Sequence, residues 1–217
     1  MLLLAADTSG KEGSIGLARG LPDGRCDLIE SVPLAGGTFS AQLVPQISAL
    51  LAKHGFQKEE IGGFCVVSGP GSFTGLRVGL AAIKALGEVF NKPIAALSLL
   101  EVIVSSANLS GKVWAAIDAG RNEVYLGEYS GQGSNERLVR REEFVALVGY
   151  ETVVTADRSI VDVAQAARLN VKPIAYPGSD AVARLGWRKL QANQTSSPVD
   201  LEANYIRRSD AEIFRTT

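Results

Sequence analysis

Two stretches of uninterrupted apolar sequence constrain this chain more than any other feature. Leu2–Ala6 contains no polar residue and is followed by Asp7, and Ile61–Val67 contains no charged residue. A strand with one face in water alternates apolar and polar residues, whereas a strand covered on both faces does not. We therefore expect an α/β fold in which the central strands of a sheet are buried on both sides.

Turn signals and helical periodicity around these stretches predict the element order β-β-β-α-β-α. A glycine-rich turn joins Leu2–Ala6 to an expected strand at Ser14–Ala18, and Cys26–Val32 is predicted to be the third strand. The first helix is predicted from apolar residues at amphipathic spacing: Leu43, Val44, Ile47, Leu50 and Leu51. A second helix is expected over Leu76–Phe90, after the strand at Ile61–Ser68.

The second half of the chain repeats part of this pattern. Ala115–Asp118 resembles Leu4–Asp7, because each is an apolar strand that ends in Asp and leads into a hairpin turn. The two aspartates are separated by about half of the 217 residues. This repeat is explained equally well by a duplicated fold and by chance similarity.

Composition excludes several kinds of site. The single histidine, His54, is too few for any two-histidine metal motif, and the two cysteines, Cys26 and Cys65, have neither C-x-x-C spacing nor a disulfide pattern. The 22 basic and 23 acidic residues provide no overall positive field for binding nucleic acid. We expect no metal site in this chain. We also do not expect the chain to provide the main nucleic-acid-binding surface.

The location of the chain is predicted from the same composition. The apolar start, Met1–Ala6, lacks the basic region of a signal peptide, and no stretch approaches the ~20 apolar residues of a membrane helix. Two cysteines without a disulfide pattern suit a reducing compartment. We expect a cytoplasmic protein with no membrane contact.

A glycine-rich segment, Gly69–Gly75, lies between an expected strand and an expected helix. Its backbone N–H groups could face an anion or nucleotide at a helix N-terminus, and the candidate residues are Gly69, Gly71, Ser72 and Thr74. The alternative, which we favour, is that the glycines only permit a tight connection. The Gly-Lys-Ser/Thr ending of a phosphate-binding P-loop is missing.

Asp7 and Asp118 are candidate carboxylates at strand ends. Such a pair could hold Mg²⁺ or orient a water molecule. The favoured alternative is that each aspartate caps its own hairpin turn. Ser72 and Thr74 have no neighbouring histidine that could activate a nucleophile, so no catalytic residue is predicted.

Three glycines, Gly75, Gly79 and Gly87, lie within or at the start of the second expected helix. Each costs roughly 1 kcal/mol relative to alanine in a helix interior, so a compensating interaction is expected. A face of small residues would allow another helix to approach closely. That helix could belong to the same chain, to a second copy or to a different protein.

Several segments together strongly resemble one protein family. They are Ala6–Ser9, Ser68–Gly79, Ser98–Glu101 and Ile117–Tyr125, and the most specific of them reads GPGSFTGLR. They are similar to the bacterial TsaB (YeaZ) family of the tRNA threonylcarbamoyladenosine machinery, clearly over residues 1–130. The chain departs from the family pattern at Phe39, Gly120 and Asn204, where members usually carry His, Arg and Pro.

The resemblance implies a two-lobed actin-like ATPase (ASKHA, RNase H-like) fold of the α/β class. Each lobe would be a mixed sheet flanked by helices. Residues 1–100 would form the N-terminal lobe, with the helices that bind a partner, and residues 101–217 the smaller C-terminal lobe. This agrees with the element order and with the repeat in the second half.

The resemblance also implies a function. Family members are scaffold subunits without catalytic residues in the complex that makes N6-threonylcarbamoyladenosine at position 37 of tRNAs reading ANN codons. They pair with a catalytic TsaD-like subunit, help to recruit a TsaE-like ATPase, meet tRNA mainly through the partner and form homodimers when alone. No cofactor of the chain's own is implied, and ATP or ADP would bind only at the interface of the complex.

The expected partner interface lies on helices 40–53 and 75–90. Its predicted contact residues are Leu43, Ile47, Leu50, Gly75, Leu76, Gly79, Ile83 and Gly87. Two other functions are open at this stage. An ATP-dependent phosphotransferase would use Asp7 and Gly69–Gly75 near phosphate, and a glycoprotease-like peptidase, which is disfavoured, would need a metal or nucleophile that the sequence does not show.

Overall fold

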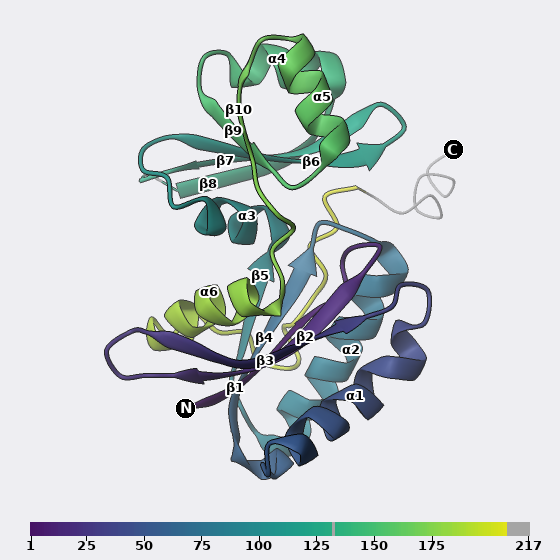
Figure 1. Ribbon diagram of the computed structural model, residues 1–217, viewed down its shortest axis with the longest axis vertical. Helices are drawn as coiled ribbons and strands as arrows, with labels where there is room; N and C mark the ends of the chain where they lie inside the picture. Colours follow the sequence, from purple (N-terminus) through teal and green to yellow (C-terminus); the bar gives the residue numbers. More distant parts are fainter. Residues whose placement is uncertain (132, 208–217) are drawn as a thin grey trace. The chain divides into compact units, whose positions relative to one another are not determined.

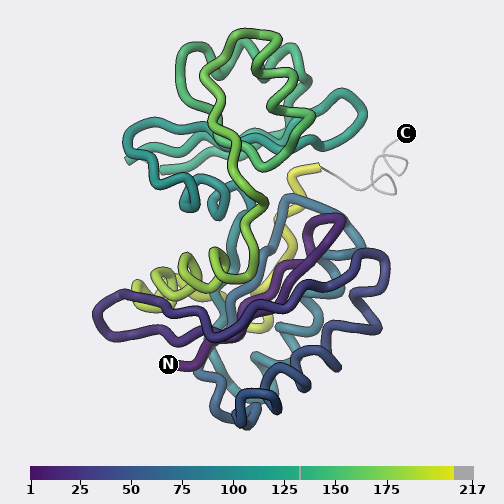
Figure 2. Tube along the Cα trace, in the orientation of Figure 1, coloured from purple at the N-terminus to yellow at the C-terminus, as the bar shows by residue number. Residues whose placement is uncertain are grey.

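The computed structural model describes residues 1–131 and 133–207 and divides the chain into two compact units. The first unit consists of Met1–Leu99 and Pro177–Ala203, and the second of Leu100–Tyr176 and the chain from Asn204 onward. The chain therefore passes between the units three times, as can be followed in Figure 2.

The first unit contains a five-stranded mixed sheet with helices on both faces. The strand order is β3-β2-β1-β4-β5, in which β1, β4 and β5 run parallel. Its strands are β1 (Leu2–Asp7), β2 (Gly13–Gly20), β3 (Cys26–Leu34), β4 (Ile61–Gly69) and β5 (Ile94–Ser98). Its helices are α1 (Phe39–Lys53), the short 3-10 helix η1 (Lys58–Glu60), α2 (Phe73–Phe90) and α6 (Ser179–Gln191).

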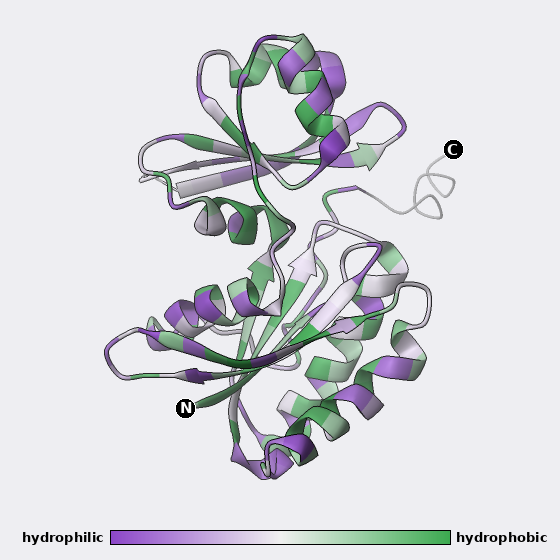
Figure 3. Cartoon of the chain, viewed as in Figure 1, coloured by the Kyte–Doolittle hydropathy of each residue, from purple (hydrophilic) through white to green (hydrophobic). Residues whose placement is uncertain are grey.

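The central strands of this sheet are covered on both faces, as their apolar sequences predicted. Leu3 and Leu4 in β1 are fully buried although they point to opposite faces, and so are Phe64 and Cys65 in β4. Figure 1 shows α1 and α2 on one face and α6 on the other, and Figure 3 shows hydrophobic residues along the inner strands. The prediction that the central strands are buried on both sides is confirmed.

The second unit repeats this arrangement with a second five-stranded mixed sheet, ordered β10-β9-β6-β7-β8. Its helices α4 and α5 lie on one face and α3 on the other (Figure 1). The strands are β6 (Val113–Gly120), β7 (Glu123–Ser130), β8 (Gly133–Arg140), β9 (Thr152–Thr155) and β10 (Asn170–Pro173). The helices are α3 (Leu99–Ala107), α4 (Arg141–Val148) and α5 (Arg158–Ala166).

The two halves of the chain have the same topology. When β1 is matched with β6 and β2 with β7, the two sheets have the same strand order. The sequence indicated this through the repeat around Asp7 and Asp118, but β8 and α4 were not predicted. The strand β8 has an irregular, largely exposed pattern, and α4 is only weakly amphipathic, so neither element has a clear period.

The last helix of each half packs in the unit built by the other half. Helix α3 follows β5 but belongs to the second unit, and α6 follows β10 but covers the first sheet with Val182, Leu185 and Leu190 buried. The structure thus differs from a division at residues 1–100 and 101–217, because residues 177–203 return to the first unit. The apolar face of α6 covers the sheet face that α1 and α2 leave open.

In the part of the chain that the structure describes, no helix is both long and apolar enough to cross a membrane.

An ion-pair cluster joins the end of α1 to strand β3. Glu30 accepts hydrogen bonds from Lys53 Nζ at 2.7 Å and pairs with His54 Nε2 at 2.7 Å. The bonds from Lys53 and then from His54 hold the pKa of Glu30 below its ordinary value of 4.5. The single histidine therefore has a structural contact at a helix C-terminus.

Replacing Glu30 with glutamine is expected to reduce stability in a pH-dependent way. Because the folded-state pKa of Glu30 is depressed, its contribution is fully present above its ordinary pKa of 4.5 and is lost as the pH falls through the folded-state value. Urea unfolding at several pH values should therefore show a difference between the Glu30→Gln variant and the parent at pH 7 that disappears in acid. A difference independent of pH would contradict this assignment.

Candidate functional site

The glycine-rich segment packs against the end of β1. The backbone N–H of Ser72 donates to the carbonyl oxygen of Ser9 at 2.7 Å, and Ser72 Oγ accepts from the N–H of Gly75 at 3.3 Å. Because Ser72 caps the helix, α2 begins at Phe73, three residues before the predicted start at Leu76. Two N–H groups that could have faced an anion are thus bonded within the chain.

The spacing between this segment and β1 explains why glycines are required. A Cβ atom at Gly71 would lie 2.5 Å from the carbonyl oxygen of Ser9, and one at Gly75 would lie 2.0 Å from that of Thr8. Thr8 Oγ1 also donates to the carbonyl oxygen of Gly75 at 2.7 Å. Close backbone packing accounts for these glycines without any ligand, as in the favoured interpretation of the sequence.

The residues predicted to contact a partner face the chain's own core. All five large residues of that set are buried in the core of the first unit: Leu43, Ile47, Leu50, Leu76 and Ile83. A Cβ at Gly79 would lie 2.3 Å from Thr8 Oγ1, and one at Gly87 would lie 2.6 Å from Ile94. This corrects the predicted residue set, because the apolar and glycine faces of both helices pack against the sheet.

The opposite sides of α1 and α2 form an exposed surface that we call the outer helical face. On α2 it is a stripe at four-residue spacing with alanines at its centre: Phe73, Arg77, Ala81, Ala85 and Val89. On α1 it consists of Ala41, Val44, Pro45, Ser48, Ala49 and Ala52. The two helices contact each other and lie on the same face of the sheet (Figure 1).

This outer helical face is unusually poor in charge for a surface. Residues 40–52 of α1 contain no charged residue, whereas the exposed side of a helix is ordinarily polar or charged. Val44 is 54% exposed and Val89 is 74% exposed. Phe73 is 37% exposed and stacks with Arg77, whose guanidinium carbon lies 3.8 Å from the ring centroid. The absence of charge over residues 40–52 could have indicated this face from the sequence alone.

The two strand-end aspartates lie in different units, and each has its own local contacts. Asp7 is buried, and its Oδ1 accepts from the N–H of Ser9 at 2.8 Å and from Ser9 Oγ at 2.6 Å. Asp118 Oδ1 accepts from the N–H of Gly120 at 3.2 Å. In both cases the carboxylate bonds the backbone two residues onward, which is the turn-capping arrangement favoured from the sequence.

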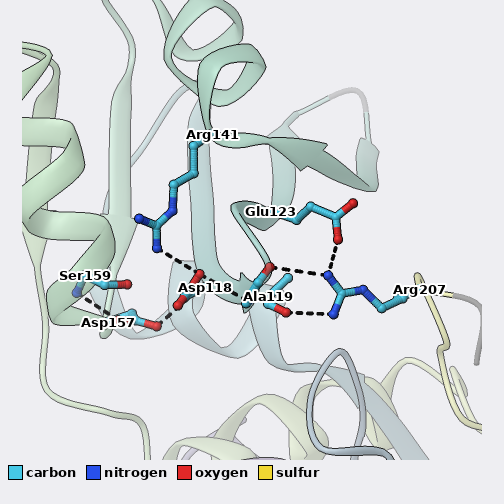
Figure 4. Close-up of polar contacts among 8 residues, drawn as sticks. Asp118, Ala119, Glu123, Arg141, Asp157, Ser159 and Arg207 are labelled. Carbon is cyan, nitrogen blue, oxygen red and sulfur yellow. Dashed lines mark hydrogen bonds and ion pairs between the residues drawn. The ribbon is translucent and has the colours of Figure 1, made fainter. Parts of the chain in front are cut away.

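Asp118 also belongs to a polar cluster at the turn between β6 and β7 (Figure 4). Arg141 Nη2 lies 3.2 Å from Asp118 Oδ1, and the N–H of Asp118 donates to Asp157 Oδ2 at 3.2 Å. Asp157 in turn caps α5 by accepting from the N–H of Ser159 at 3.0 Å. Among the described residues, no group of three or more His, Cys, Asp or Glu side chains is arranged to hold a metal ion.

Neither cysteine is arranged as a nucleophile. Burial raises the pKa of Cys65, which is fully enclosed, and also raises the pKa of the half-buried Cys26. A raised pKa keeps a thiol protonated and unreactive at neutral pH.

The positions that depart from the family pattern have structural contacts. Phe39 is buried, and its ring would lie 2.9 Å from a Cβ at Gly13 and 3.4 Å from one at Gly75. Gly120 has a φ of 70° at the end of β6, a conformation that glycine adopts readily. Asn204 Nδ2 donates to Glu136 Oε2 at 3.0 Å.

The chain is similar in sequence to proteins of one tRNA-modification pathway. The family model described as "TsaD: tRNA N6-adenosine threonylcarbamoyltransferase" matches residues 33–149, which is more than half of the chain. The "tRNA threonylcarbamoyladenosine biosynthesis protein TsaB" of Bacillus subtilis (strain 168) is 28% identical over 163 residues. That alignment covers 74% of this chain and 69% of the relative.

Solved structures share the fold. "YeaZ from Pseudomonas aeruginosa" has a TM-score of 0.73 at 22% identity and covers 94% of this chain and 99% of that chain. The activator of 2-hydroxyisocaproyl-CoA dehydratase from Clostridium difficile, solved with bound ADPNP, has a TM-score of 0.52 at 11% identity and covers 89% of this chain and 97% of that one. The fold is the two-lobed actin-like ATPase fold expected from the sequence.

A methyl group at Gly75 tests the packing of the glycine-rich segment. In an open helix position Gly→Ala is stabilising, but here the new Cβ meets the Thr8 carbonyl, so Gly75→Ala should destabilise by about 2 kcal/mol. Urea unfolding measures the difference. Gly131→Ala is the control, because nothing lies within 4 Å of a Cβ at Gly131. Equal stability of the Gly75→Ala variant and the parent would show that the segment is not tightly packed.

Proposed function

Because this chain belongs to the TsaB (YeaZ) family, we propose that it takes part in tRNA threonylcarbamoyladenosine biosynthesis as a scaffold subunit without a catalytic site of its own. Its partner in this role is a catalytic subunit of the TsaD type. The TsaD subunit performs the transfer to adenosine 37 of tRNAs reading ANN codons, and this chain holds it in a competent complex.

The observation that carries this proposal is the outer helical face of α1 and α2. A face that has exposed valines, small residues and no charge over residues 40–52 loses little hydration when another protein covers it. Small side chains such as Ala81 and Ala85 permit close approach of a helix. The stacked Phe73 and Arg77 are residue types that are enriched at protein interfaces.

The internal bonding of the strand-end and loop groups supports a role without catalysis. The carboxylate of Asp7 and the N–H groups of Ser72 and Gly75 are bonded to neighbours within the first unit. In an ATP-dependent phosphotransferase the N–H groups would face phosphate oxygens, and the carboxylate would hold Mg²⁺ beside them. Their present partners favour the scaffold over that alternative.

The rest of the proposed assembly is the one that the family resemblance implies. The TsaB–TsaD pair recruits a TsaE-like ATPase in the cytoplasm, and any ATP or ADP binds at the interface of the complex. The tRNA is held mainly by the partner, since this chain has 22 basic and 23 acidic residues and no overall positive field. In the absence of its partner the chain forms a homodimer through the outer helical face.

An acidic side chain at the centre of the outer helical face should disrupt binding. Ala81 is exposed, so Ala81→Glu leaves the core intact but places a charge where the partner must pack. We expect affinity for the TsaD-type partner, measured by isothermal titration calorimetry, to fall at least about tenfold, equivalent to ~1.4 kcal/mol.

The matched control is Ala166→Glu, the same change at an exposed helical position of the second unit, on α5. It should bind the partner as the parent does. Equal affinity of the Ala81→Glu variant and this control would contradict the assignment of the outer helical face.

The scaffold role itself is tested by reconstituting tRNA modification from purified components. Formation of threonylcarbamoyladenosine by the TsaD-type subunit should depend on this chain and should fall with the Ala81→Glu variant but not with Ala166→Glu. Full modification without this chain would contradict the proposal.

A further inference from the structure

The chain returns to the second unit for the last time through a short polar segment, Asn204–Arg207. The preceding anchor is Leu201, which is 4% exposed in the core of the first unit. The segment is part of no helix or strand, Asn204 and Tyr205 are exposed, and Ile206 is only half-buried. Its attachment to the second unit therefore depends mainly on polar contacts.

Arg207 makes three of these contacts at the turn between β6 and β7. Its Nη1 donates to the carbonyl oxygen of Ala119 at 2.8 Å, and its Nη2 lies 3.4 Å from that of Gly120. Nη2 also forms an ion pair with Glu123 (Figure 4). A planar guanidinium presents five N–H donors in a rigid fork on three nitrogens, whereas the three donors of a lysine ammonium all lie on one nitrogen.

Asn204 provides a second attachment point on the same sheet. Its Nδ2 donates to Glu136 Oε2 at 3.0 Å, and the other oxygen of Glu136 accepts from the hydroxyl of Tyr129. The segment is therefore bound to β8 at its start and to the β6–β7 turn at its end.

The turn that receives Arg207 has supports of its own. The N–H of Arg141 donates to the carbonyl oxygen of Asn122 at 3.1 Å, and Asn122 Nδ2 donates to Glu142 Oε1 at 3.0 Å. Asp118 pairs with Arg141 on the same turn. Because α4 holds the turn through these contacts, its acceptors are in place whether or not Arg207 is bound.

We propose that the carbonyl oxygens of Ala119 and Gly120 and the carboxylate of Glu123 form a guanidinium-binding site, occupied by Arg207 of the same chain as a releasable latch. The side chains of Arg207 and Glu123 are 23% and 32% exposed, so water and salt reach the ion pair. Residues 204–207 are held at both ends when Arg207 is bound, and by the Asn204–Glu136 contact alone when it is released.

The state of the latch can be measured by cleavage at Arg207 itself. Trypsin cuts after arginine only when the guanidinium enters the protease pocket, so a bound Arg207 protects its own peptide bond. Glu123→Gln removes the ion pair and keeps the cleavage site. We expect the initial rate of cleavage after Arg207, identified by fragment mass, to rise by about fivefold, which corresponds to the loss of a partly exposed ion pair of about 1 kcal/mol.

The matched control is Glu128→Gln. Glu128 lies on β7, like Glu123, and pairs with Lys112 at 2.8 Å rather than with Arg207. The control removes the same charge from the same strand, so its cleavage rate after Arg207 should equal that of the parent. Faster cleavage of Glu123→Gln alone supports the latch, and equal rates for all three proteins would overturn it.

Hydrogen exchange on the full chain provides the second readout. With Glu123→Gln, exchange should increase at residues 204–207 but not at residues 119–123, in β9 or in α5. An increase throughout the second unit would overturn the proposal, because the contact would then belong to the general stability of that unit. For the parent, L-argininamide should increase exchange at 204–207 more than L-lysinamide at equal concentration, and equal effects would contradict a site for guanidinium.

Discussion

The close approach of the α2 N-terminus to the end of β1 is the constraint on which the first unit depends. A Cβ at Gly75 would lie 2.0 Å from the Thr8 carbonyl oxygen, so the chain can make this contact only without a side chain there. The contact fixes where α2 begins and directs its glycine face and Leu76, Leu80 and Ile83 toward the sheet. It also commits the N–H groups of Ser72 and Gly75 to partners within the chain.

These contacts within the chain determine which surface of α1 and α2 other molecules can reach. Since the apolar and glycine faces of α1 and α2 are used by the core, the surface available for docking is the opposite one, with small residues and the Phe73–Arg77 stack. In the second unit, the Asp118 carboxylate accepts from the N–H of Gly120, two residues onward. The Asp7 carboxylate in the first unit accepts from the N–H of Ser9 in the same way. The actin-like ATPase fold is thus combined with strand ends at which Asp7 and Asp118 bond their own neighbours.

The sequence predicted those features whose physical signal is local. Apolar runs located the buried strands, and the repeat around Asp7 and Asp118 indicated the matched topology of the two sheets. Helical periodicity located α1 and α2 but could not tell whether the glycines face the chain's own sheet or a partner. That choice depends on Thr8, which is distant in sequence. The return of α6 to the first unit was also missed, because an amphipathic helix does not specify which sheet it covers.

We infer that the Asp7 carboxylate and the N–H groups of Ser72 and Gly75, which could otherwise serve a nucleotide site, are occupied by contacts within the chain. Equilibrium dialysis of ATP against the isolated chain is a direct test. We expect no saturable binding up to about 1 mM ATP; a dissociation constant of that size corresponds to a binding free energy of about −4 kcal/mol. Saturable binding at micromolar ATP that is lost on replacing Asp7 with Asn or Ser72 with Ala would contradict it.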